Sequence, residues 1–405
     1  MNRLVQGDVG SGKTVVAAAV IYTAAKNNIQ SAFMAPTDIL ARQHFETLTK
    51  LFEPFGITVE LLTGSVTAKR KREIKERLRS GETQVIVGTH AIITDDTEFE
   101  RLGLVITDEQ HRFGVRQRSA LNGKGINPHT LVMSATPIPR TISLILYGDL
   151  DLTVIDELPK GRQKISTYAV DTSYRERIYA FIKKHLDMGL RAYIVCPLVE
   201  ENDGDLTAAK QYAEKLQSKH FEKYNVGLLH GKMKPKEKEK IMSDFASGEI
   251  NLLVSTTVIE VGVDVPESVI MVVENAERFG LSQLHQLRGR VGRGKHKSYC
   301  ILISDTESES TRSRLGIMCK TSDGFKIADK DLELRGPGDF FGSRQSGIPT
   351  LKIAELTENM DTVRESKQAS EELLKDDPRL KKEENLRLRK AVAQLFTKDK
   401  GSTLN

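Results

Sequence analysis

The sequence has 405 residues, of which 39% are hydrophobic and 28% charged, as is ordinary for a soluble globular protein of two or three domains. Its net charge of +5 is too small to indicate nucleic-acid binding, so a phosphate-binding surface must come from local clusters of Lys and Arg. It has no apolar run of the roughly 18 residues that a membrane span requires, and its first ten residues do not resemble a signal peptide, so we expect a cytoplasmic protein without membrane contact.

Short apolar runs rich in strand-forming residues alternate with helical stretches in the first part of the chain. The helical stretches include residues 14–25, which follow a glycine-rich loop, and the basic residues 68–79. This alternation predicts a parallel sheet with crossover helices. The run before Gly7 is short and leaves little room for an intact first strand. The predicted strands are residues 31–35, 84–88, 102–108 and 130–134.

The same alternation restarts after Gly161. A helix is predicted from Pro235 to about Gly248, because Pro favours the first turn of a helix and Gly the position after its end. Two of the three cysteines, Cys196 and Cys300, lie in apolar runs, and none forms a C-x-x-C pair with another, so we expect buried free thiols rather than a metal or redox site. The predicted strands are residues 191–196, 225–230, 250–255, 268–273 and 298–304.

The character of the chain changes a third time near residue 306. Gly, Asp, Arg and Phe dominate residues 323–347, and the remainder is charged and helical with an interruption at Pro378. The sequence therefore predicts an α/β protein with two parallel-sheet domains and a C-terminal segment. The expected ranges are 1–157, 158–305 and 306–405.

A phosphate-binding loop is predicted at residues 7–14, which read GDVGSGKT and match G-x-x-x-x-G-K-[ST]. Glycines let the backbone wrap closely around phosphates, and the loop opens a helix whose N–H groups point at the ligand. Lys13 would reach the β- and γ-phosphates, and Thr14 would hold Mg²⁺. The remaining candidate nucleotide contacts are Gly7, Asp8, Gly10, Ser11 and Gly12.

An apolar run that ends in Asp108 and Glu109 supplies the acids that magnesium-assisted phosphoryl transfer needs. Asp108 is expected to bind Mg²⁺, directly or through water, and Glu109 to orient and activate the attacking water. An acidic pair after a strand is weak evidence alone, but here the phosphate loop lies upstream. ATP and Mg²⁺ are therefore the expected cofactors.

Arginines in the second predicted domain complete this set. Residues 286–293 read QLRGRVGR, and Arg290 and Arg293 are expected to neutralise charge on the transferring phosphate. The alternative is that these arginines form a plain phosphate-binding surface for nucleic acid.

The ordered motifs GDVGSGKT, DEQH, SATPIPRT, STTVIEVGVDVP and HQLRGRVGRG resemble those of superfamily-two helicases, and most closely the RecG family. Residues 331–347, DLELRGPGDFFGSRQSG, resemble the translocation motif that RecG shares with the transcription-repair coupling factor. The resemblance implies two tandem RecA-like domains followed by a helical translocation segment with its motif at 325–347. It also implies an ATP-dependent helicase or translocase that acts on branched DNA, in fork reversal and Holliday-junction processing during recombination and repair.

The resemblance assigns roles to further residues of this sequence. Gly262 and Asp264 match the motif that faces the nucleotide, and Gln286 belongs with Arg290 and Arg293 to the final helicase motif. Four residues are expected to couple the nucleotide state to DNA: Thr136, Arg140, Arg335 and Gln345. For Arg335 the alternative is a structural arginine buried against acids.

The resemblance also implies partners and leaves alternatives. Duplex and branched DNA are the expected partners, and the resemblance allows single-stranded DNA-binding protein as a further partner. The chain is expected to be a monomer. Relatives carry an adenine-contacting segment and a wedge domain upstream of the phosphate loop, so we expect this chain to be a fragment. The alternatives are a coupling-factor-type DNA translocase, an RNA helicase, and an inactive DNA-binding remnant.

Overall fold

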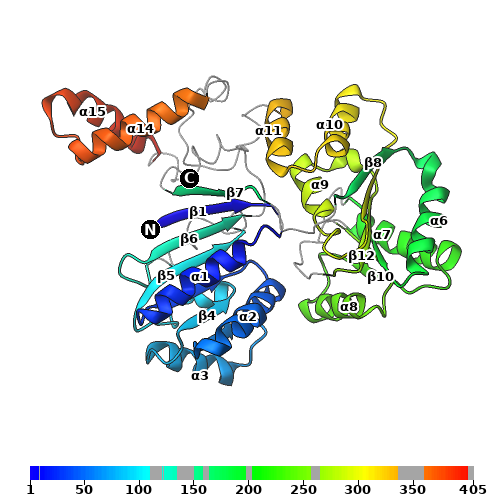
Figure 1. Ribbon diagram of the computed structural model, residues 1–405, viewed down its shortest axis with the longest axis horizontal. Helices are drawn as coiled ribbons and strands as arrows, with labels where there is room; N and C mark the ends of the chain where they lie inside the picture. Colours follow the sequence, from blue (N-terminus) through cyan, green and yellow to red (C-terminus); the bar gives the residue numbers. More distant parts are fainter. Residues whose placement is uncertain are drawn as a thin grey trace. The chain divides into compact units, whose positions relative to one another are not determined.

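The computed structural model describes residues 1–8, 10–109, 121, 123–134, 150–157, 164–197, 203–256, 265–335 and 360–399. Within these ranges the chain builds two parallel β-sheets covered by helices, followed by further helices (Figure 1). The chain divides into two compact units, and both sheets belong to the first unit. No helix among these residues is both long and apolar enough to cross a bilayer.

The first sheet has seven strands in the order β3-β4-β2-β5-β6-β1-β7, and every pairing is parallel. Its central strands are almost entirely buried, as expected of strands that are covered on both faces. The strands are β1 (Asn2–Gly7), β2 (Gln30–Met34), β3 (Val59–Leu62), β4 (Val85–Gly88), β5 (Leu102–Asp108), β6 (His129–Ser134) and β7 (Asp151–Ile155).

Helices lie on both faces of this sheet. Helix α1 (Lys13–Lys26) and helix α2 (Asp38–Phe52) pack with one set of strand side chains, and α3 (Ala68–Arg79) packs with the opposite set. Short 3-10 turns follow α2 (Glu53–Phe55) and β4 (His90–Ile92). The sheet is therefore the middle layer of a three-layer domain.

The second sheet has six parallel strands in the order β10-β11-β9-β12-β13-β8. Helices α6 and α7 pack on one face, and α8, α9 and α10 on the other. The strands are β8 (Ser166–Val170), β9 (Arg191–Val195), β10 (Val226–Leu229), β11 (Leu252–Ser255), β12 (Ser268–Val273) and β13 (Tyr299–Ile303). The helices are α6 (Arg175–Leu186), α7 (Asp203–Lys215), α8 (Pro235–Ser247), α9 (Leu281–Arg288) and α10 (Glu309–Lys320).

The C-terminal part is helical. Helix α11 (Gly324–Arg335) begins in the first compact unit, and helices α14 (Met360–Asp376) and α15 (Leu386–Asp399) belong to the second. Asp377 follows α14 directly, and its carboxylate accepts hydrogen bonds from the amides of Lys381 and Lys382 and from the side chain of Asn385. The remaining turns are 3-10 at Thr172–Tyr174, Ala276–Arg278 and Glu383–Asn385, and π-helical at Leu216–His220.

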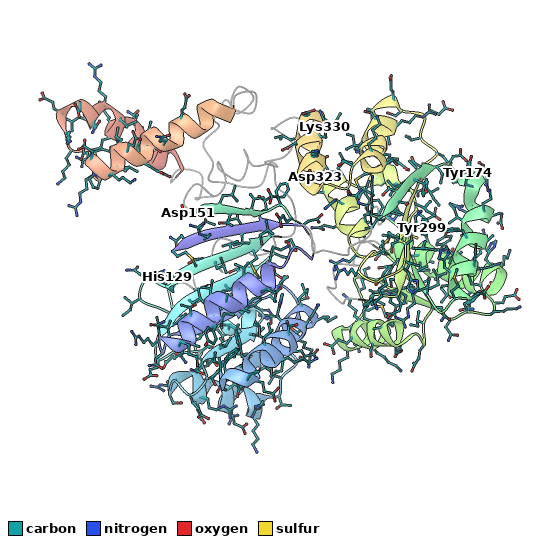
Figure 2. All side chains as sticks on the ribbon, viewed as in Figure 1. His129, Asp151, Tyr174, Tyr299, Asp323 and Lys330 are labelled. Atoms are coloured by element: carbon teal, nitrogen blue, oxygen red, sulfur yellow. The ribbon has the colours of Figure 1, made fainter. Side chains whose placement is uncertain are left out.

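Most of the predicted helices and strands are present, and their ends lie within two residues of the predicted ends. The prediction that little room remains for a first strand is wrong: β1 starts at Asn2 and pairs with β6 on one side and β7 on the other. Figure 2 labels His129 and Asp151, which begin β6 and β7 at the edge where β1 also begins. Arg3 binds Asp151 there at 3.2 Å. The sequence did not predict β3, β7 or β8, which are edge strands and only partly buried.

The described cysteines hold free thiols. Cys300 is buried in β13, Cys196 is half-buried after β9, and Cys319 is exposed. Burial raises the pKa of the Cys300 thiol to about 12, so this group is protonated at neutral pH.

Candidate active site

The phosphate loop connects β1 to α1 and depends on glycine. Gly10 and Gly12 have φ values of 80° and 92°, in the left-handed region that L side chains rarely adopt. At Gly7 a Cβ atom would collide with Ser11 Oγ and approach Ile155 Cβ to 3.2 Å. The loop turns through a hydrogen bond of 3.1 Å from Ser11 N to Asp8 O. Glycine at these positions therefore allows the tight turn of the loop.

The side chains of the loop are arranged to receive an anion. Lys13 is buried, and its Nζ donates to Gly7 O at 2.8 Å and Asp8 O at 2.9 Å. Ser11 Oγ is buried and has no hydrogen-bond partner among the described residues. Gly12 caps α1 without a side-chain bond, and the first turn of α1 contains no acid. A phosphate fits this set, because it would accept from Lys13 and Ser11 and from the first N–H groups of the helix.

The acidic pair lies at the end of β5. Asp108 is 9% exposed, and its Oδ1 accepts a hydrogen bond of 3.1 Å from the backbone N of Glu109. Glu109 has a φ of 51°, which is unusual for a residue with a Cβ and which the sequence did not predict. Such strained conformations concentrate at functional sites.

The loop and the acids share one edge of the sheet. β5 pairs in parallel with β6, and β6 with β1, so Asp108 and Gly7 both end strands at the carboxyl-terminal edge, with one strand between them. In open parallel sheets this edge is where ligands bind. The oxygen atoms of Thr14 and Asp108 are the donor type that Mg²⁺ prefers, so the residues present fit that ion.

The arginine-rich motif spans the end of α9 and the residues after it, and its arginines are held differently. Arg288 is 3% exposed and donates to three carbonyls, Met318 O at 2.9 Å, Thr321 O at 2.8 Å and Ser322 O at 3.1 Å. Arg290 and Arg293 are half-buried, and Arg293 Nε donates to Gly289 O at 3.2 Å. Arg288 therefore secures the fold, and the two arginines of the prediction are more accessible.

Two histidines that the sequence analysis did not single out contact acids of the site. His285 Nε2 lies 2.9 Å from Asp8 Oδ1, and its Nδ1 lies 3.0 Å from a nitrogen of Arg288. His44 Nε2 lies 3.0 Å from Asp108 Oδ2. A signal for His44 was available: it follows Ala41 by three residues and precedes Leu48 by four, which places it on the core-facing side of α2.

Several predicted residues lie outside the described residues: Thr136, Arg140, Gly262, Asp264 and Gln345. Arg335 is described only as the last residue of α11, and Gln286 is half-buried in α9. Of the polar residues that follow β2 and β4, Thr37 caps α2 through Leu40 N, Thr89 is buried and His90 is exposed. No group of acidic, His or Cys side chains in the described part of the chain is arranged to hold a metal ion by itself.

Three family models match the chain in succession. Residues 1–145 match the DEAD/DEAH box helicase family and residues 174–295 the helicase conserved C-terminal domain. Residues 321–400 match domain 3, C-terminal, of the ATP-dependent DNA helicase RecG. Curated relatives with that name include those of Bacillus subtilis, 52% identical over 93% of this chain, and Thermotoga maritima, 51% identical over 88%.

The chain belongs to the RecG family.

Solved structures agree with this assignment. A RecG bound to a three-way DNA junction matches 90% of this chain with 45% identity and a TM-score of 0.74. S. cerevisiae Dbp5, solved with RNA and ADP BeF3, matches 91% of this chain with 18% identity and a TM-score of 0.58, which shows a shared fold. Both sheets thus have the tandem RecA-like arrangement. The chain spans 55% of the Bacillus subtilis RecG, 46% of the Thermotoga maritima RecG and 47% of the RecG in the junction structure.

Proposed function

We propose that this chain carries the ATP-driven motor of a DNA helicase that acts on duplex and branched DNA. The observation that carries the proposal is the placement of the phosphate loop and the acidic pair at one edge of one sheet, in a RecG-family chain. Neither motif is decisive alone, but together they supply anion binding and acid–base groups at one place.

Lys13, Ser11 and the start of α1 bind the phosphates. Thr14 and Asp108 hold Mg²⁺, which when bound neutralises charge on the transferring phosphoryl group. Glu109 orients the attacking water and accepts its proton. The strained backbone of Glu109 and the hydrogen bond from its N to Asp108 Oδ1 support a fixed position for both acids.

Arg290 and Arg293 stabilise the transition state of the hydrolysis. Their half-buried side chains support this role over a purely structural one, because the structural positions of the motif are taken by Arg288. Gln286, Gly262 and Asp264 belong to the same nucleotide-facing surface by their place in the family motifs.

DNA is held chiefly through its phosphates, because aromatic residues make up 6% of the sequence and Trp is absent, which leaves little for base stacking. His90 and Arg42 are exposed and supply such contacts. The segment 325–347, with Arg335 and Gln345, transmits the motion of the motor to DNA together with Thr136 and Arg140. Fork reversal, Holliday-junction processing and an interaction with single-stranded DNA-binding protein follow from the RecG family, and we propose a monomer in the cytoplasm.

The test is phosphate release by the purified chain without nucleic acid, with linear duplex, with forked duplex and with single-stranded RNA. We expect Mg²⁺-dependent hydrolysis that both DNA forms stimulate more than RNA does. Glu109→Gln is the control for contaminating ATPases. Hydrolysis that RNA stimulates as strongly as DNA would favour an RNA helicase, and no hydrolysis above the control would leave only a DNA-binding protein.

A binding titration of linear and forked duplex at two salt concentrations tests the DNA contacts. Phosphate contacts carry charge attraction without reading sequence or junction geometry, so we expect similar, salt-sensitive affinities for both forms. A clear preference for the fork would assign junction recognition to this chain itself.

A further inference from the structure

His44 is an unusual residue for its place in the fold. It lies on the face of α2 that also buries Ala41 and Leu48, and it is itself 9% exposed. Burying an imidazole costs free energy unless its ring nitrogens find partners. The identity of the partner therefore indicates what the residue does.

Three elements of the first domain meet at this side chain. The ring of His44 lies against Phe33 of β2, with ring centroids 4.5 Å apart and an angle of 44° between the planes. Its Nε2 reaches Asp108 Oδ2, at the end of β5, at 3.0 Å. Strands β2 and β5 are paired neighbours, so the aromatic contact and the acid are fixed relative to each other.

The chemistry of the pair sets the direction of the hydrogen bond. An ionised carboxylate only accepts hydrogen bonds, so Nε2 of His44 carries the proton and donates it. Asp108 Oδ1 accepts from Glu109 N, and Oδ2 accepts from His44. Each carboxylate oxygen has a second lone pair, so both remain able to accept from a metal-bound water or to meet the metal itself.

We propose that His44 is a positioning residue: it fixes the carboxylate of Asp108 for magnesium in the nucleotide site. The inference rests on the proposed function and deepens it. Without the donor, Asp108 would keep only one hydrogen bond from the described residues and could rotate away from the metal. Groups that orient metal ligands in this way change metal affinity by about 10- to 100-fold when they are removed.

The test separates this role from that of a core histidine. His44→Leu removes the donor, and His44→Asn keeps an amide that is too short to reach the same point. His44→Gln places an amide nitrogen near the position of Nε2. The matched control is His185→Leu, because His185 is also buried, lies 4.4 Å from the ring of Phe181, and bonds a backbone carbonyl rather than an acid.

The measurement is the affinity of a fluorescent ADP analogue as Mg²⁺ is titrated, with thermal unfolding of each variant alongside. For His44→Leu and His44→Asn we expect the Mg²⁺ concentration of half-maximal effect to rise by about 10-fold, with the affinity in EDTA unchanged. For His44→Gln we expect the Mg²⁺ concentration of half-maximal effect to stay within about 3-fold of the parent value. For His185→Leu we expect this concentration to be unchanged.

Two outcomes would overturn the inference. One is a Mg²⁺ midpoint for both His44→Leu and His44→Asn equal to that of the parent. The other is an equal loss of ADP affinity with and without Mg²⁺, which would mean that His44 only supports the fold. If His44→Leu does not fold, the comparison of His44→Asn with His44→Gln decides. A parent chain that binds no ADP at any Mg²⁺ concentration would refute the proposed function itself.

Discussion

The carboxyl-terminal edge of the first sheet and that of the second sheet both collect charged residues, but the charges are paired differently. At the second edge, Glu274 follows β12 with only 7% of its side chain exposed. Its oxygens accept from Arg175 at 2.7 Å and from Tyr212 at 2.6 Å, and Tyr212 lies 3.1 Å from the hydroxyl of Tyr179. Burial, and then the charge of Glu274, raises the pKa of Tyr212, so this hydroxyl stays protonated.

At the first edge, Lys13 and Asp108 make hydrogen bonds to the backbone and to a histidine. Lys13 lies against two carbonyls, and Asp108 accepts from an amide and from His44. Lys13 Nζ can exchange carbonyl oxygens for phosphate oxygens, whereas Glu274 cannot leave Arg175 without becoming an unpaired buried charge. We infer that the first edge is prepared for a ligand, whereas the second network stabilises its domain.

The largest effect is expected at the phosphate loop. Lys13→Ala removes the cation that holds the β- and γ-phosphates, and turnover should fall to background in a phosphate-release assay. Glu109→Gln should also stop turnover but preserve ATP binding, because the change leaves the loop intact. Hydrolysis at the parental rate by Glu109→Gln would show that another group activates the water.

The arginines at the end of α9 and just after it should separate into two classes by the property that their substitution changes. Arg290→Ala and Arg293→Ala should each lower turnover by about 10³-fold with ATP affinity broadly unchanged, because these groups act in the transition state. Arg288→Ala is the contrasting variant. Because three backbone carbonyls lose their hydrogen-bond donor, we expect a lower melting temperature as its main effect. Unchanged ATPase per bound complex with weakened DNA binding in Arg290→Ala would indicate a DNA-phosphate contact instead.

The network at the second edge should affect stability rather than chemistry. Glu274→Ala leaves Arg175 and Tyr212 without their partner, and we expect a loss of roughly 2–4 kcal/mol in the free energy of unfolding. Glu98→Ala is the control, since Glu98 and Arg79 are both exposed and pair at 3.2 Å; it should cost about 0–1 kcal/mol in the same urea titration. Equal losses would remove the distinction between the two pairs.

The smallest effect is expected at Asp377, which serves neither edge. The Lys381 amide, the Asn385 side chain and the Lys382 amide hold the pKa of this carboxyl down to about 2. Its stabilising contribution is therefore present above the ordinary Asp pKa of about 3.9 and is lost as the pH falls toward 2. Asp377→Ala should speed hydrogen exchange at the Lys381 and Lys382 amides by roughly 5- to 10-fold, with exchange in β5 unchanged. Equal acceleration in β5 would mean that Asp377 stabilises more than its own turn.

Recognition from sequence succeeded where a local pattern is sufficient. The predicted strand at 102–108 and the predicted helix at 68–79 have the same bounds in the structure. An apolar run and a capped amphipathic stretch are local patterns that each indicate one type of secondary structure. The sequence did not predict strands β7 and β8, because these edge strands are half-exposed and lack a continuous apolar run. The length of β1 was underestimated because its residues become strand by pairing with β6 and β7, which are distant in sequence.

The sequence by itself determined the phosphate loop, the acidic pair, the arginine motif and the family, since each is a short run whose spacing carries its chemistry. Only the tertiary structure decided which charged groups are paired. The contacts of His44 with Asp108 and of Arg175 with Glu274 join residues 64 and 99 positions apart. The order of strands in a parallel sheet brings such residues together, and no local pattern encodes that order.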